Sequence, residues 1–276
     1  MLTRKRIEAL AEVSTLPLSS RKIISALSND ATTVYDYEEL ISHDQALASK
    51  VVSTANSAFY HTHRGIAVNS IDQAILVLGL DAIRNIALGI SIFKIFPVPY
   101  EALKQMWAHA YRVALASGFL ASKIDQSDKE VAFLAGLLHD IGRIVLLTVG
   151  KEGELSRFPG SKGREIIPAE QEVFSCSHME AGYWFLKGLS LPEEVILPVL
   201  YHHEFPEKAE HPLITAPVYI AEGLLGGYPG DEAADGAWSE RAKALAAEYA
   251  IGQEVLDECL AILAMDNEFI RAFFEY

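Results

Sequence analysis

Apolar residues recur every three to four positions along most of this chain, the spacing that predicts amphipathic helices. Leu47, Val51 and Ala55 follow one another at intervals of four and mark one face of a helix. The run from residue 86 to 96 is almost continuously apolar and is interrupted by Lys94. It is too short to span a bilayer and is interpreted as a buried helix. Because no stretch shows a convincing period-two alternation, we predict an all-α fold without strands.

A serine followed three residues later by glutamate or glutamine is the signature of a capping box at a helix start. The pattern occurs at Ser70, Ser127 and Ser177, and each is predicted to open a helix. The helix from Ser70 is predicted to end at Gly79, and Asp81 to cap the next helix. This pair is similar to a helix-turn-helix, but two packed helices of a bundle are the preferred interpretation because the chain is acidic.

Proline and glycine indicate where the helices are separated. The segment 97–99, Pro-Val-Pro, breaks the periodic pattern and is the best internal boundary. A long helix is predicted to follow, from about Glu101 to Ile124. Pro192 and Pro212 stand at the first positions of two later helices. Two stretches rich in glycine and charged residues are predicted to be loops: residues 150–168 and 226–236.

Composition narrows the class of protein. Half of the 276 residues are hydrophobic, which excludes a disordered chain. The formal net charge of −14, without a basic patch, argues against nucleic acid as a partner. The two cysteines, Cys176 and Cys259, cannot form a disulfide framework and fit a reducing cytosol. No long apolar stretch follows the basic residues near the start, so we expect no signal peptide, no membrane and a cytoplasmic location.

The dipeptide His139-Asp140 lies in an otherwise apolar predicted helix. Burying an imidazole and a carboxylate there is unfavourable unless something compensates, and a divalent cation would do so. Consecutive helical residues point about 100° apart, so both side chains could reach the gap between helices, with Asp140 able to bridge two ions. Histidines on four predicted helices are candidate ligands of the same site: His109, His139, His178, His202 and His203.

Imidazole nitrogens with few carboxylates suit Fe, Mn, Ni, Zn or Co better than Mg or Ca. Six ligands exceed what one tetrahedral zinc ion uses. We therefore expect a divalent transition metal, with two ions, Fe or Mn favoured and Ni, Zn or Co as alternatives. A lone buried histidine is more often a hydrogen-bonded core residue, but four histidine-bearing helices would each need a separate explanation. Five other residues are interpreted as surface histidines or a core thiol: His43, His61, His63, His211 and Cys176.

The order of these candidate ligands resembles the HD superfamily of metal-dependent phosphohydrolases, especially the HD-GYP phosphodiesterases. The first half of the chain makes the resemblance sharper, because it is similar to the HDOD domain, the HD-related output domain of bacterial signalling proteins. The resemblance implies an N-terminal helical subdomain packed on an HD-like helical bundle, in a bacterial cytoplasmic protein. The motifs that carry the HDOD resemblance lie at residues 16–17, 41–52, 55–60 and 71–80.

The resemblance covers about residues 5–225 and implies a division into three segments. Residues 1–98 are predicted to form the N-terminal helical part of the HDOD domain. Residues 99–230 are predicted to form the HD-like metal-binding helical core, and residues 231–276 the C-terminal helices.

Three departures from the HD-GYP pattern bear on the site. The terminal aspartate ligand is replaced by Glu222, which can still ligate although its side chain is longer by one methylene. Gln105 stands where some HD-GYP enzymes place a glutamate. The tripeptide at 227–229, Gly-Tyr-Pro, follows the histidine pair too late and is interpreted as a coincidental turn. A cyclic-dinucleotide phosphodiesterase is correspondingly disfavoured.

Three functions remain open from the sequence. In the first, the chain is a signalling output protein that binds metal and acts through a protein partner; residues 56–60 and the aromatic C-terminus are candidate contact surfaces, although core packing explains both more simply. In the second, it is a phosphohydrolase or phosphodiesterase for a phosphorylated small molecule or nucleotide. Its catalytic residues would be Asp140 and Arg143. Asp140 would bind the metal that carries the attacking hydroxide, and Arg143 would hold the phosphate. The third is a metal-free helical domain. The first is preferred.

Overall fold

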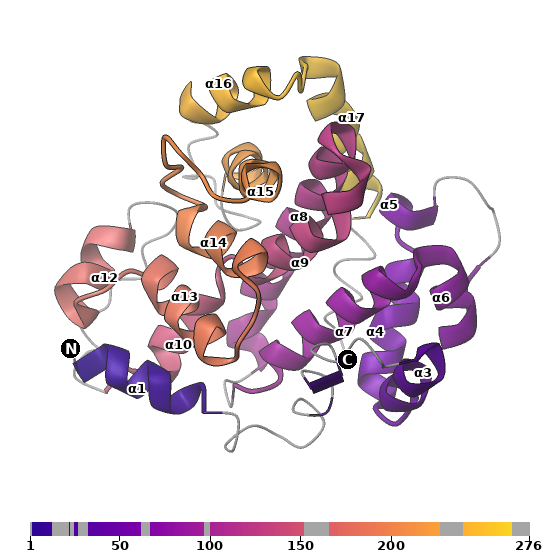
Figure 1. The fold of residues 1–276 in the computed structure, drawn as a ribbon, viewed down its shortest axis with the longest axis horizontal. Helices are drawn as coiled ribbons and strands as arrows, with labels where there is room; N and C mark the ends of the chain where they lie inside the picture. The colour runs from indigo at the N-terminus through magenta and orange to yellow at the C-terminus, as the bar shows by residue number, and fades with distance from the viewer. Residues whose placement is uncertain are drawn as a thin grey trace. The chain divides into compact units, whose positions relative to one another are not determined.

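The computed structural model is entirely helical in its regular structure within the residues that it describes, which confirms the predicted fold class (Figure 1). The described residues are 2–12, 22, 25–26, 33–61, 67–96, 100–151, 166–226 and 240–266.

Packing divides the chain into two units, and each is discontinuous in sequence. The core unit comprises Met1–Thr15 and Phe96–Leu256, and the second unit comprises Leu16–Ile95 and Asp257–Tyr276. The sequence analysis divided the chain into consecutive segments instead. The helices of the core unit are α1 (Leu2–Leu10), α8 (Tyr100–Ile124), α9 (Lys129–Leu138), α10 (Ile141–Val149), α12 (Ile166–Phe174), α13 (His178–Gly188), α14 (Glu193–Tyr201), α15 (Pro212–Leu225) and α16 (Glu240–Glu248). Those of the second unit are α3 (Val34–Ser42), α4 (Gln45–Ala55), α5 (Ala58–His61), α6 (Ile71–Leu78) and α7 (Leu80–Phe93), and α17 (Gln253–Met265) spans the boundary.

The second unit follows the predicted apolar pattern closely. Leu47, Val51 and Ala55 are fully buried on one face of α4, as predicted. Ser70 caps α6 by accepting the backbone N–H of Gln73. The Gln73 side chain accepts the N–H of Asn69, so the reciprocal half of the predicted capping box is displaced by one residue.

The junction of α6 and α7 differs from its prediction. Gly79 adopts φ +85°, a conformation that favours glycine, and joins two helices that bend by 117°. Because α7 begins at Leu80, Asp81 lies in its first turn and is not its cap. A one-residue link is shorter than the turn of a helix-turn-helix, so the two helices are better described as part of the bundle.

Residues in the segment 56–60, a candidate contact surface in the sequence analysis, make contacts within the second unit. The Asn56 amide pairs with both backbone groups of Val68: Nδ2 donates to the carbonyl and Oδ1 accepts the N–H, each at 2.8 Å. The Asp266 carboxylate accepts the N–H of Ala58 at 2.7 Å. These contacts hold Asn56 and Ala58 against other residues of the second unit.

Helices α8 and α9 run side by side in the core unit, and α15 lies against both (Figure 1). The long predicted helix is confirmed as α8. The start of α9 differs from the prediction, because a 3-10 turn at Gln126–Asp128 precedes it and Asp128 is its N-cap, not Ser127. A close approach of α9 to α8 depends on Gly136, where an added Cβ would lie 2.9 Å from the backbone of Ala114.

The His139-Asp140 dipeptide does not lie in the middle of a helix, which corrects the prediction. Helix α9 ends at Leu138 and α10 begins at Ile141, so His139 is the C-cap of one helix and Asp140 the N-cap of the next. The apolar periodicity continues through the junction, and this is why the sequence pattern missed the break.

By length and hydropathy alone, the described segment Lys129–Val149 could cross a membrane, and α6 and α7 pass that test only when joined across their bend. In the structure 83% of the apolar window in Lys129–Val149 is buried inside the fold. The segment is therefore a core element of the described structure.

The later helix starts agree with the sequence to within one residue. Ser177 forms a complete capping box with Glu180 at the start of α13, as predicted. Pro192 is the N-cap of α14, one residue before its predicted position, and Pro212 is the first residue of α15. The predicted loop at 150–168 ends sooner than expected, because α12 begins at Ile166.

Helix α1 packs against α10 and α13, far from it in sequence. Its apolar face buries Ile7, and Ala11 follows the helix against α13. A Cβ added at Gly188 would lie 2.6 Å from the Ala11 side chain, so glycine permits this close contact. Arg6 donates to the carbonyl of Val149, the last residue of α10. Helix α1 thus belongs to the same packed body as the helices that carry the candidate ligands.

Candidate metal centre

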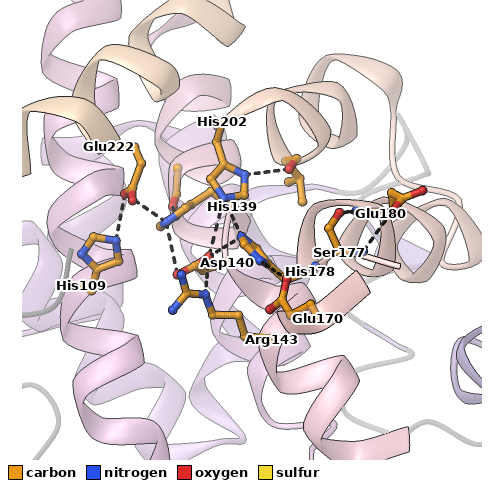
Figure 2. Close-up of polar contacts among 12 residues, drawn as sticks. His109, His139, Asp140, Arg143, Glu170, Ser177, His178, Glu180, His202 and Glu222 are labelled. Carbon is orange, nitrogen blue, oxygen red and sulfur yellow. Dashed lines mark hydrogen bonds and ion pairs between the residues drawn. The ribbon is translucent and has the colours of Figure 1, made fainter. Parts of the chain in front are cut away.

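The structure brings all seven predicted ligands together from five parts of the core unit, and Figure 2 labels each of them except His203. All seven are buried. They come from α8, the junction between α9 and α10, the first turn of α13, the end of α14, and α15: His109, His139, Asp140, His178, His202, His203 and Glu222.

The seven side chains form two groups, within each of which one ligand atom per residue lies within 4.8 Å of the others. The first ligand group is Asp140, His178, His202 and His203. In it, Oδ1 of Asp140 lies 3.4 Å from Nε2 of His178 and 3.6 Å from Nε2 of His202. The two Nε2 atoms are 3.2 Å apart.

The second ligand group is His109, His139 and Glu222. Oε2 of Glu222 lies between the two imidazoles, 2.9 Å from Nε2 of His109 and 3.5 Å from Nε2 of His139 (Figure 2). The longer side chain of Glu222 therefore still reaches the predicted position.

Asp140 connects the two ligand groups. Its Oδ2 lies 3.7 Å from Nε2 of His139 in the second group, while its Oδ1 faces the histidines of the first. A carboxylate with one oxygen toward each group has the geometry required of a bridging ligand.

Outer contacts fix which imidazole nitrogens face inward. Nδ1 of His139 donates to the Gly136 carbonyl and Nδ1 of His202 to the Val199 carbonyl, each at 2.7 Å. Nδ1 of His178 lies 2.7 Å from Oε2 of Glu170. Since a carbonyl oxygen can only accept, His139 and His202 carry a proton on Nδ1, and in its neutral form each ring presents an unprotonated Nε2 to the centre of the site.

The inward atoms are therefore lone pairs that face one another. Nε2 of His178 faces Nε2 of His202 without a proton to share when both rings are neutral, while Nε2 of His139 faces carboxylate oxygens. Atoms bound about 2.1 Å from one ion lie roughly 3.0–3.5 Å from each other, close to the separations seen here. The residues present thus fit divalent transition-metal ions in number, chemistry and spacing.

Electrostatics favour the protonation states that metal ligands need. Burial lowers the pKa of His178, His202 and His203, so these rings are neutral. Burial opposes ionisation of Asp140, but Arg143 and the histidines hold its pKa well below the usual range. The pKa of Glu222 is also well below its usual range, because His109 and His139 outweigh burial.

The pKa of His139 shifts in the opposite direction from the pKa values of these three histidines. Burial opposes its protonation, but the carboxylates of Asp140 and Glu222 raise its pKa above the usual value. A positive charge is therefore favourable at this point between the two carboxylates.

The structure also reveals a residue that the sequence analysis missed. Glu170 of α12 is completely buried, and its Oε2 accepts both the backbone N–H and the ring N–H of His178, at 2.8 and 2.7 Å. Burial raises the pKa of Glu170 to about 8, against the opposing effect of the His178 N–H. The available signal was its place between Ile166 and Phe174 on the apolar face of a helix.

We expect Glu170→Ala to weaken binding in the first ligand group by about 10- to 100-fold, because ligand histidines depend on such partners for orientation. Glu170→Gln is the matched control, since its amide oxygen can accept the same two hydrogen bonds without charge. Calorimetric titration with Mn²⁺ measures both variants. Equal affinity in the alanine variant and the wild type would contradict an orienting role.

Arg143 is buried and is not a surface residue. Its Nε lies 3.1 Å from Oδ1 of Asp140 (Figure 2). The residue proposed from sequence to hold a phosphate thus contacts a candidate ligand in this structure.

His43, His211 and the two cysteines lie outside the two groups. His43 and His211 are exposed, as predicted. Burial raises the pKa of the Cys176 thiol to about 12, which fits a core residue better than a thiolate ligand. Other predictions fall outside the description: residues 97–99, His63 and 227–229 are not described, and neither are the side chains of His61 and Gln105.

Comparison with known proteins agrees with this architecture. A family model for the HDOD domain matches residues 13–205, a range that ends before Glu222. An uncharacterized protein of Treponema pallidum (strain Nichols) is 26% identical over 213 residues, which cover 75% of this chain and 41% of that protein. The chain thus spans about two fifths of the length of this curated relative.

Solved structures show the same fold. An HDOD domain protein of unknown function from Geobacter sulfurreducens is 23% identical, with a TM-score of 0.66, and the match covers 94% of this chain and 91% of that one. A candidate metal-dependent phosphohydrolase from Shewanella amazonensis SB2B is 20% identical, with a TM-score of 0.70 and complete coverage of both chains. At these identities the likeness concerns the fold alone.

Proposed function

The chain belongs to the HDOD domain family, and from this premise we propose that it is a signalling output protein whose core binds two divalent transition-metal ions and which acts through a protein partner. Fe or Mn is favoured, with Ni, Zn or Co as alternatives. A reducing compartment is part of the proposal, supported by the two buried cysteines, Cys176 and Cys259.

The convergence of unprotonated nitrogens and carboxylate oxygens carries the metal-binding part of this proposal. A core of hydrogen-bonded histidines would pair each Nε2 with a donor, whereas here Nε2 of His178 faces Nε2 of His202 at 3.2 Å. The position of Asp140 between the two ligand groups supports two ions over one.

Metal-dependent hydrolysis of a phosphoester is the second candidate function, and the bridging position of Asp140 favours it. Two bound ions would supply Lewis acidity and activate a water. Asp140 would fix their spacing, and burial of the ligands would exclude bulk water. The contact of Arg143 with Asp140 weighs against hydrolysis, because that guanidinium would have to leave Asp140 to bind a phosphate.

Elemental mass spectrometry on the full chain, purified without nickel affinity, tests the proposal. We expect about two equivalents of iron or manganese per chain. A chain without stoichiometric metal would exclude hydrolysis and the metal-binding part of the signalling role, and would leave a partner-binding helical scaffold without metal. Turnover of bis(p-nitrophenyl) phosphate by the metal-loaded protein would favour hydrolysis, while full metal content without turnover would favour the signalling role.

A further inference from the structure

A positive charge, the guanidinium of Arg143, already lies beside the first ligand group. Only 7% of this residue is exposed, and its Nε lies 3.1 Å from Oδ1 of Asp140. Arg143 is also the strongest of the influences that keep the pKa of Asp140 low. The ion pair is thus a buried contact with structural consequences, unlike an exposed surface pair.

The oxygen that Arg143 contacts is the one that an ion in the first ligand group would need. Oδ1 of Asp140 also faces Nε2 of His178 and Nε2 of His202, at 3.4 and 3.6 Å. An ion held by these three atoms would lie about 2.1 Å from Oδ1. The guanidinium and the ion would then be within roughly 5 Å of each other at a single buried oxygen, where like charges repel strongly.

We propose that Arg143 is the resident cation of the metal-free site and that a divalent ion in the first ligand group competes with it for Oδ1 of Asp140. This inference rests on the proposed metal binding and adds a means of regulating it. Arg143 lowers the affinity of the first group for metal while it stabilises the metal-free fold.

A displaced guanidinium needs another buried hydrogen-bond acceptor, and the carboxyl group of Glu170 provides one. The Oε2 atom of Glu170 is engaged by His178, but its Oε1 is buried without a hydrogen-bond partner among the described residues. Arg143 already interacts electrostatically with this carboxyl group. Loading of the first group would thus transfer Arg143 from Asp140 toward Glu170.

The decisive experiment compares wild type and Arg143→Met, each with and without Mn²⁺, by urea denaturation and calorimetric titration. Competition predicts that the variant is less stable than wild type without metal, equally stable when loaded, and at least tenfold tighter in Mn²⁺ binding. Arg241→Met, which removes an exposed positive charge paired with Glu248, is the control and should change none of these.

Other outcomes overturn the proposal in recognisable ways. Unchanged or weaker Mn²⁺ affinity in Arg143→Met would mean that the ion pair persists in the loaded protein. Unchanged stability without metal, together with a more stable loaded state, would indicate repulsion at a distance without competition. Absence of Mn²⁺ binding by the wild type would overturn the proposed metal function itself, and the inference with it.

A measurement on the wild type keeps the test valid if Arg143→Met does not fold. In protein labelled with ¹⁵N-arginine, the Arg143 Nε–H resonance can be assigned with Arg143→Lys. Saturation with Zn²⁺, which is diamagnetic, should shift this resonance as the contact with Asp140 is lost. An unchanged resonance in the zinc-loaded protein would contradict displacement.

Discussion

Asp140→Asn is expected to remove both metal equivalents from the protein, the largest effect of any single ligand substitution. Asp140 is the residue that faces both ligand groups, through Oδ1 and Oδ2 separately. An amide keeps the shape of the side chain but replaces one anionic oxygen with a donor, which cannot ligate. Elemental mass spectrometry on the purified variant measures the loss.

Glu222→Gln is the matched comparison, because Glu222 contacts histidines of the second ligand group. It should lose about one equivalent and retain the other. Loss of one equivalent in both variants would contradict the bridging position of Asp140. Asp140→Asn should also lower the free energy of unfolding of the metal-free protein by about 3 kcal/mol, because Arg143 loses its buried anionic partner.

Gly142→Ala is expected to destabilise the core unit by at least about 3 kcal/mol, the upper range for overpacking a rigid contact. A Cβ at Gly142 would collide with the backbone carbonyl of His178 and lie 2.6 Å from the backbone nitrogen of Gly182. Backbone atoms cannot move aside as a flexible side chain can. Helices α10 and α13 would have to separate, and His178 would move away from Asp140.

Urea denaturation measures the stability loss, and Mn²⁺ titration measures the accompanying loss of affinity. Gly252→Ala is the control, since an added Cβ there meets nothing within 4 Å. Its effect should stay within about 0.5 kcal/mol. Similar small effects at both glycines would mean that the contact between α10 and α13 is looser than the structure indicates.

The convergence of the histidines and Asp140 was predictable from the pattern of polar and apolar positions along the chain. Polar, metal-binding side chains occur at apolar helical positions, and a helical bundle brings such positions inward. Glu222 was placed with the histidines by the resemblance to the HD-GYP pattern, which has an aspartate ligand at that point. Whether these side chains hold ions stays a prediction.

What the sequence did not predict depends on contacts between helices. The end of α9 at Leu138 has no local signal, because residues on both sides are apolar. The contact of Arg143 with Asp140 has an i,i+3 spacing that a continuous helix also allows, but the sequence analysis assigned Arg143 to a phosphate instead. Glu170 was overlooked because one carboxylate in a helix is ordinarily exposed, and its partner His178 lies in another helix.

The placement of α1 has a consequence for synthesis on the ribosome. This helix is made before its packing partner α13, which ends only at Gly188, after residues 16–95 of the second unit have been translated. At about 5–20 residues per second, α1 waits roughly 10–35 s with the apolar side chain of Ile7 uncovered. Until α1 packs against α13, the nascent chain exposes the apolar face of this helix, and chaperones that bind such segments would bind it at this stage.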